Sequence, residues 1–137
     1  MRKRKKIVLL ILVMVGLTMW SCEKEKSDID ITSNSWEVVK IKKQGKHTYT
    51  KVKETYVLEF INDSVYTLKL DVNDCEGNYT AGGDGKINIE SMACTEICCD
   101  SELAEDLVRL LPEMTDYYGI DQELILAGEG EIILKQH

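Results

Sequence analysis

Residues 55–70 have the sequence TYVLEFINDSVYTLKL, and this stretch predicts the character of the whole domain. Apolar and polar residues alternate through 55–60 and again through 65–70, and side chains that alternate in this way point to opposite faces of a strand. Between the two runs stands Asn62-Asp63-Ser64, a combination typical of tight turns. The stretch therefore predicts an antiparallel hairpin with one buried face.

Similar period-two patterns lie on both sides of this hairpin and give about seven short strands in all. They begin at Trp36, Val38 and Ile41, return at residues 86–89 after the turn Gly82-Gly83-Asp84-Gly85, and end around 124–126 and 132–134.

A single helix is predicted between these strands. Asp100 or Ser101 can cap its N-terminus, and Pro112 ends the helix or bends its last turn. The apolar residues at helical spacing are Leu103, Leu107, Leu110, Leu111 and Met114. The sequence thus predicts an α+β fold over residues 35–137, a mostly antiparallel β-sheet or partial barrel with one helix.

The N-terminus has the layout of a secretory signal. Five cations at residues 2–6 precede an apolar run over 7–20, which is shorter than the roughly 20 residues that a spanning helix needs. Met19-Trp20-Ser21-Cys22 resembles the bacterial lipobox, in which a small residue precedes the cysteine that becomes acylated. We therefore expect a signal peptide over residues 1–21 and a lipid anchor on Cys22; the alternatives are an uncleaved membrane anchor and ordinary cleavage that leaves Cys22 as a free thiol.

The chain that would remain, residues 22–137, is strongly acidic. It carries twelve lysines and arginines against 24 aspartates and glutamates, a balance that disfavours nucleic acid and bare anionic membrane as partners. Residues 22–34 are polar and predict a flexible tether, and they resemble the export signals of Bacteroidetes surface lipoproteins. The expected location is the bacterial outer membrane, on its periplasmic face or at the cell surface.

Four further cysteines lie in the domain: Cys75, Cys94, Cys98 and Cys99. In a small exported domain an even number of cysteines predicts a disulfide framework. A bond between the adjacent Cys98 and Cys99 would require a strained peptide geometry, so we expect Cys75 to pair with one of these two and Cys94 with the other. A four-thiolate zinc site and a redox pair are the alternatives, although the sequence contains no CxxC spacing.

Several short motifs resemble those of the META domain, or HslJ-like, lipoprotein family. They are Asn73-x₃-Gly77-x-Tyr79, residues 86–89 with Thr95-x₃-Cys99, Leu107 to Leu111, Tyr118-x-Ile120, Leu124-x-Leu126, and the positions of Trp36 and Phe60. Val72 stands where the common family form has a cysteine, so a family disulfide pattern cannot be transferred. The resemblance implies a compact β-rich fold and an envelope location, and it implies no active site.

No catalytic or metal-binding constellation is recognisable. His47 and His137 are single and far apart, and residues 71–76 begin like a calcium loop but then depart from its ligand pattern. We therefore expect a protein that is not an enzyme and needs no cofactor, an envelope-maintenance or interaction module with an unknown envelope protein as its partner. The alternative is a lipocalin-like carrier of a small apolar ligand, which would need a barrel of about eight strands.

Overall fold

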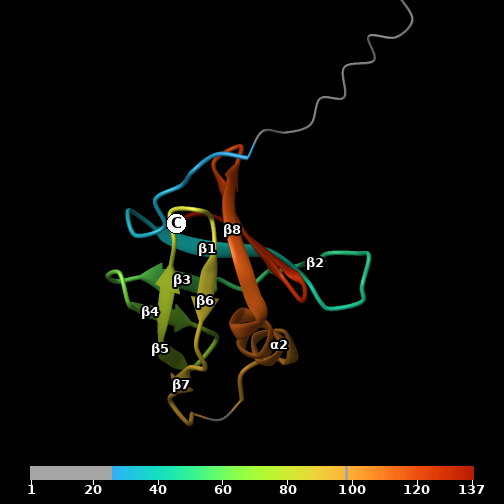
Figure 1. Cartoon of the computed structure of the whole chain (residues 1–137). Helices are drawn as coiled ribbons and strands as arrows, with labels where there is room; N and C mark the ends of the chain where they lie inside the picture. Colours follow the sequence, from blue (N-terminus) through green and yellow to red (C-terminus); the bar gives the residue numbers. More distant parts are fainter. Residues whose placement is uncertain (1–25, 98) are drawn as a thin grey trace, which may run out of the picture.

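The computed structural model describes residues 26–97 and 99–137 (Figure 1). The predicted signal peptide, Cys22, the first tether residues and Cys98 lie outside the described residues. No described helix is long and apolar enough to cross a membrane.

Antiparallel strands dominate the structure. In chain order the elements are β1 (Ser35–Lys42), β2 (Thr50–Lys51), β3 (Val57–Phe60), β4 (Val65–Lys69), β5 (Asp74–Ala81), β6 (Ile87–Ile89), β7 (Ala93–Cys94), the helix α2 (Glu102–Leu110), the 3₁₀ turn η1 (Leu111–Glu113), β8 (Met114–Ile120), β9 (Glu123–Gly128) and β10 (Glu131–Gln136). The sheet order is β6-β5-β4-β3-β1-β10-β9-β8, with β2 paired to β1 and β7 paired to β5.

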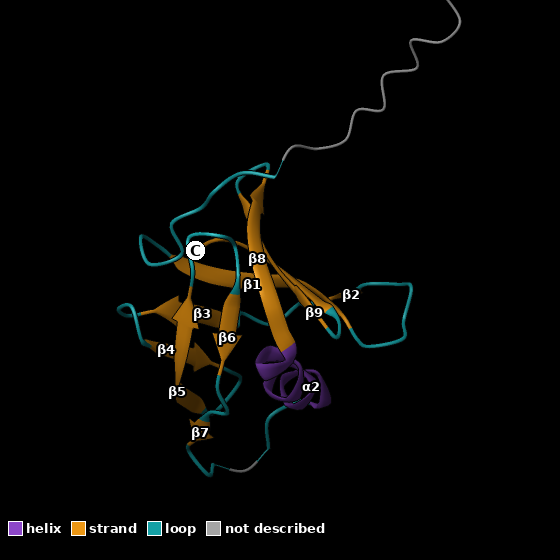
Figure 2. Cartoon of the chain, in the orientation of Figure 1, coloured by secondary structure: helices purple, strands orange, loops and turns teal. Residues whose placement is uncertain are grey.

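The two ends of this sheet meet, so that the sheet forms a nearly closed barrel. Lys86, just before β6, forms an isolated antiparallel bridge with Asp116 of β8, and the Tyr117 amide donates to the Gly85 carbonyl at 2.8 Å. The helix α2 and the turn η1 lie at one end of the barrel (Figure 2). The predicted α+β fold with a mostly antiparallel sheet and one helix is therefore confirmed.

Bulky side chains fill the barrel. The largest of the fully buried residues are Trp36, Tyr56, Tyr66 and Phe60, and the helical end contributes Leu107 and Leu111, each at 1% exposure or less. Burial of an aromatic or leucine side chain contributes about 1.5–3 kcal/mol, so these positions dominate the stability of the core.

The predicted hairpin over residues 55–70 is confirmed as β3 and β4. The Asn62 side-chain oxygen accepts the amides of Ser64 at 2.9 Å and Val65 at 3.0 Å, which closes the turn. Tyr79 reaches this turn from β5, because its hydroxyl donates to the Asn62 carbonyl at 2.6 Å and its ring packs edge-on against Phe60, with centroids 4.7 Å apart. The last residue of the Asn-x₃-Gly-x-Tyr motif thus holds the hairpin to the next strand.

Gly77, the middle residue of that motif, leaves room for a neighbouring ring. A Cβ atom at this position would lie 2.6 Å from the Tyr66 hydroxyl, so no other residue fits without a shift of the ring. Tyr66 crosses β5 at this point and donates to the Glu90 carbonyl at 2.7 Å. Burial raises the pKa of Tyr66 to about 12.

The helix α2 begins after Ser101, one of the two predicted N-caps, and ends at Leu110, before the last two apolar residues of the predicted helical spacing. Ser101 is the N-cap, and its side chain accepts the Ala104 amide at 3.2 Å. Pro112 lies in the 3₁₀ turn that follows Leu110, so Leu111 belongs to η1 and Met114 opens β8. The expectation that Leu111 and Met114 continue the helix is therefore wrong.

The folded structure extends N-terminal to residue 35, the predicted domain boundary. The amides and carbonyls of Ser27 and Gly119 exchange hydrogen bonds of 3.0 and 2.9 Å. Ile31 is 5% exposed in the core, and its carbonyl accepts the Trp36 indole N–H at 2.8 Å. Residues 27–31 of the expected tether thus pack on the barrel, which leaves a much shorter link to Cys22.

Candidate functional site

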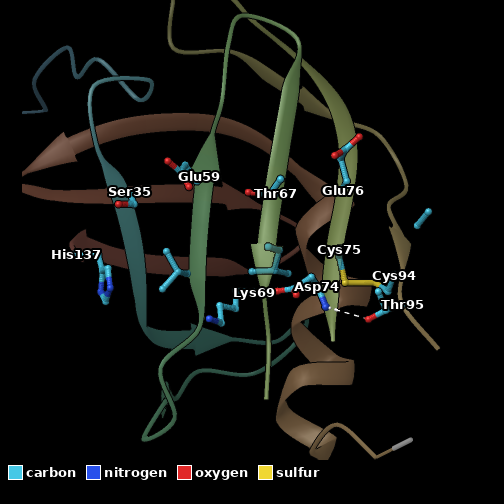
Figure 3. A pocket seen from close by; sticks show the side chains of 13 residues that line it. Ser35, Glu59, Thr67, Lys69, Asp74, Cys75, Glu76, Cys94, Thr95 and His137 are labelled. Atoms are coloured by element: carbon cyan, nitrogen blue, oxygen red, sulfur yellow. Dashed lines mark hydrogen bonds between the residues drawn. A yellow bond between two sulfur atoms is a disulfide. The ribbon is translucent and has the colours of Figure 1, made fainter. Parts of the chain in front are cut away.

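A groove with a volume of about 780 Å³ lies on the outer face of the sheet (Figure 3). Strand alternation sends every second side chain outward here, and the antiparallel register aligns them across neighbouring strands. Ser35, Glu59, Thr67 and Glu76 are successive partners across β1, β3, β4 and β5. They form one transverse row of the groove.

A second row lies beside the first. Val57, Lys69 and Asp74 are successive partners on β3, β4 and β5. Ala93 and Cys94 from β7 also line the groove, and together with Val57 they give its floor an apolar part. The groove therefore combines apolar contact area with polar groups at fixed spacings.

Two carboxylates face each other across the first row. Glu59 and Glu76 both partner Thr67 from opposite sides, so their strands lie two spacings, or about 10 Å, apart. Both side chains belong to exposed residues, and among the described residues neither forms an ion pair. This part of the groove is thus negatively charged and open to a cationic group.

The groove ends at a disulfide whose pairing differs from the expected one. Cys75 is bonded to Cys94, with a Cα–Cα distance of 4.0 Å, so the expectation that Cys75 pairs with Cys98 or Cys99 is wrong. The reason is strand register: β7 is only two residues long, and it places Cys94 directly opposite Cys75. Such close cross-strand partners lie within disulfide reach. Cys99 is also disulfide-bonded, so the prediction that the domain contains disulfides is confirmed, whereas the predicted pairing is not.

Asn73 holds together the two loops at this end of the barrel. Its side-chain nitrogen donates to the Ile97 carbonyl at 2.8 Å and to Asp100 Oδ2 at 2.6 Å, and its side-chain oxygen accepts the Thr95 hydroxyl at 2.7 Å and the Ile97 amide at 2.9 Å. A neutral amide has two donors and two principal acceptor positions, and all four are used. The first residue of the Asn-x₃-Gly-x-Tyr motif therefore fixes Thr95, Ile97 and Asp100 against the start of β5.

A second polar cluster fixes the helix to the same end. Asp71 Oδ2 accepts the Ser101 amide at 3.0 Å, the Ser101 hydroxyl at 2.8 Å and the Tyr56 hydroxyl at 3.0 Å. Burial raises the pKa of Asp71, but these hydrogen bonds outweigh it and lower the pKa below the ordinary 3.8. Burial raises the pKa of Tyr56 to about 12, so this hydroxyl stays protonated at neutral pH.

The structure also shows where the two histidines lie, which the sequence analysis did not assign to a site. His137 lines the groove and lies 3.6 Å from Glu37, whereas His47 is exposed elsewhere. In the described parts of the chain, no three of the residues His, Cys, Asp and Glu come close enough to hold a metal. Glu59 and Glu76 were not identified from the sequence, because only their common register with Thr67 brings them together.

Comparison with known proteins identifies the fold. The model of the META domain family matches residues 29–136. A DUF4847 family protein from Bacteroides vulgatus ATCC 8482 has a similar structure, with a TM-score of 0.59 at 15% identity, over 78% of this chain and 94% of that one. A protein from Burkholderia xenovorans has a TM-score of 0.63 at 13% identity, over 85% of this chain and 96% of that one. No curated protein matches the sequence.

The Asp71 cluster predicts a pH dependence of stability. A carboxyl whose pKa is lowered by folding stabilises the protein above the ordinary pKa near 3.8, and this contribution disappears as the pH falls through the folded-state value. We expect Asp71→Asn to reduce the free energy of unfolding by about 0.5–1 kcal/mol near pH 7, since solvent screens this exposed carboxylate, and the difference from the wild type to shrink below about pH 4. Urea denaturation of the variant and the wild type, at pH 7 and at about pH 3, measures the difference in the free energy of unfolding.

The matched control is Asp63→Asn, a change of the same kind at an exposed residue in the turn between β3 and β4. It is expected to leave the unfolding free energy within about 0.5 kcal/mol of the wild type at both pH values. An Asp71→Asn deficit that stays constant down to pH 3 would show that the carboxylate charge does not hold the helix.

Proposed function

The chain belongs to the META domain family, and we propose that it is a lipid-anchored lipoprotein of the bacterial cell envelope that binds a partner protein in the groove on the outer face of its sheet. The proposed role is that of a non-enzymatic interaction module. The anchor is an acylated Cys22, and the expected site is the outer membrane, on its periplasmic face or at the cell surface.

The observation that carries the envelope location is the Cys75–Cys94 disulfide. Disulfides persist in oxidising compartments and are rare in the bacterial cytosol. The bond closes a segment with a sequence separation of 19, and such a bond contributes about 3 kcal/mol to stability under the chain-entropy account. The cationic and apolar N-terminal segments support the same location, because they have the layout of an export signal.

The filling of the barrel favours the outer groove over the interior as the binding surface. The ring of strands from β6 to β8 has the eight members that a small carrier barrel needs. However, Trp36, Tyr56, Tyr66 and Phe60 occupy its interior at 1% exposure or less. A lipocalin-like carrier of a small apolar ligand is the alternative function, and it would require these side chains to move aside.

The groove has features that suit a protein partner. Its apolar part, at Val57 and Ala93, lies beside the carboxylates Glu59 and Glu76. Interfaces between proteins combine apolar contacts with polar groups that fix the orientation of the partner. The strands β3 and β5, which carry Val57, Glu59 and Glu76, are paired on both sides, so this part of the groove is formed before any partner binds.

The lipid anchor is tested by the intact mass of the protein extracted from membranes of the producing bacterium and alkylated without prior reduction. The expected mass is that of residues 22–137 plus acyl chains, with no alkylated thiol. The Cys22→Ala variant is the control and should carry no acyl mass. A wild-type mass that retains residues 1–21, or that shows alkylated thiols, would contradict the proposed compartment.

The groove is tested by photo-crosslinking in intact cells. A photoreactive residue in place of Thr67, at the middle of the groove, should give an adduct with one partner protein, whereas the same residue in place of the exposed Thr80 on β5 should give none. The Glu76→Lys change should reduce the Thr67 adduct at least about fivefold, because reversal of a charge in contact with a partner costs about 1 kcal/mol or more. Equal adducts at Thr67 and Thr80, or an unchanged yield in Glu76→Lys, would count against the groove.

A further inference from the structure

The positive charge of this acidic chain is concentrated in residues 38–53, which we call the lysine arm. The arm contains no aspartate or glutamate, and its basic residues are Lys40, Lys42, Lys43, Lys46, Lys51 and Lys53. The rest of residues 22–137 has six basic and 24 acidic residues. Figure 1 shows the hairpin around β2 standing clear of the barrel. Charge is thus segregated on this surface, with a cationic arm on an anionic body.

Part of the arm's charge has no counterpart within the described structure. Lys40 and Lys51 are direct partners across β1 and β2, and like charges at such positions destabilise a strand pair. Lys46 and Lys53 are exposed and form no ion pair with another described residue. An anion bound from outside would relieve the repulsion between Lys40 and Lys51.

The arm continues a face of the barrel that carries a lysine at each end, and at the β8 end Lys26 shares a hollow with Asp28, Asp30, Asp84 and Asp116. Tyr118, Ile125, Ile133, Lys40 and Lys51 are successive partners across β8, β9, β10, β1 and β2. This row spans four strand spacings, or roughly 19 Å. At its β8 end the Lys26 ammonium lies 4.0 Å from the centre of the Tyr118 ring. The face therefore presents lysines on either side of an aromatic and aliphatic centre.

Three of the acidic residues on this face form ion pairs. Asp116, Glu131 and Glu37 pair with Lys86, Lys42 and Lys135 respectively. Glu123 lies across the strands from Lys135, whose ammonium already pairs with Glu37. Anions therefore meet less repulsion on this face than the net charge of the chain suggests.

The face also lies near the proposed lipid anchor. Lys26 is four residues from Cys22, and four residues span at most about 14 Å. Tyr49 on the arm is 40% exposed, with the Lys42 ammonium 4.9 Å from its ring centre. Tyrosine and lysine side chains suit the membrane interface, where the ring and the aliphatic stem contact lipid and the polar ends reach the headgroups.

From the charge segregation, the Lys40–Lys51 opposition and the closeness of Lys26 to the anchor, we infer that the lysine arm and the face from β8 to β2 bind the anionic headgroups of the membrane that carries the chain. This inference rests on the proposed lipid anchor. Its consequence is a fixed orientation, in which the acidic groove over β3, β4 and β5 points away from the lipid surface and toward a partner.

The test uses the acylated protein, extracted from membranes and reconstituted into vesicles of phosphatidylcholine with or without phosphatidylglycerol. A water-soluble amine-reactive reagent labels the lysines, and mass spectrometry reads the labelling rate of each one. We expect Lys46, Lys51 and Lys53 to react at least about threefold more slowly when phosphatidylglycerol is present, since each lysine near an anionic surface gains about 1 kcal/mol. Lys69 in the groove should react equally in both vesicles, and added salt should abolish the protection.

Matched variants separate the arm from the rest of the surface. Lys46→Gln combined with Lys53→Gln should remove most of the protection at Lys51, whereas Lys69→Gln should leave it unchanged. Equal labelling of the arm in both vesicles, for protein whose mass includes acyl chains, would overturn the inference. Protection by soluble polyphosphate but not by phosphatidylglycerol vesicles would also overturn it.

A failure of the lipid anchor can be told apart from a failure of the arm. If the mass shows no acyl chains, the same labelling is done with the unacylated protein in the presence of each kind of vesicle. Protection of Lys46, Lys51 and Lys53 that depends on phosphatidylglycerol would then support the arm as a headgroup-binding surface, and its absence would overturn that assignment.

Discussion

The four hydrogen bonds of the Asn73 side chain determine how one end of the barrel is built. A buried amide is costly unless all its positions are paired, so these bonds hold Thr95, Ile97 and Asp100 in one arrangement relative to β5. That arrangement leaves Cys94 opposite Cys75 and brings Ser101 to Asp71, where the helix begins. The disulfide, the helix and the distal end of the groove all depend on this one side chain.

The packed interior has a consequence for where binding takes place. Because aromatic rings fill the barrel, the proposed binding of a partner is assigned to the outer face, on which carboxylates and lysines occupy different regions. Carboxylates from Glu59 and Glu76 mark the groove over β3, β4 and β5, while lysines mark the arm and the face that continues it.

Local patterns were sufficient for the parts of the fold that local interactions determine. The hairpin over 55–70, the Ser101 cap and the strands around 124–126 and 132–134 all follow from alternation, turn chemistry or capping. By contrast, β5 was not predicted as a strand, because Gly77 and the polar residues that surround it do not give a strong apolar alternation. The Cys75–Cys94 pairing depends on β7, which has only two residues, and the meeting of Glu59 with Glu76 depends on register across three strands. Contacts of this kind depend on the register between strands that are distant in the sequence, and a local sequence pattern does not predict that register.

The most direct measurement is the free energy of unfolding of Asn73→Asp beside that of Asn78→Asp, by urea denaturation at neutral pH. Both variants make the same isosteric change on or next to β5, but Asn78 is exposed whereas Asn73 is 7% exposed and lies 2.6 Å from Asp100. The account predicts a loss of about 2–4 kcal/mol for Asn73→Asp, because two donors are lost and a carboxylate is buried beside another, and a loss under about 0.5 kcal/mol for Asn78→Asp. Equal losses in the two variants would contradict the claim that Asn73 holds this end of the barrel together.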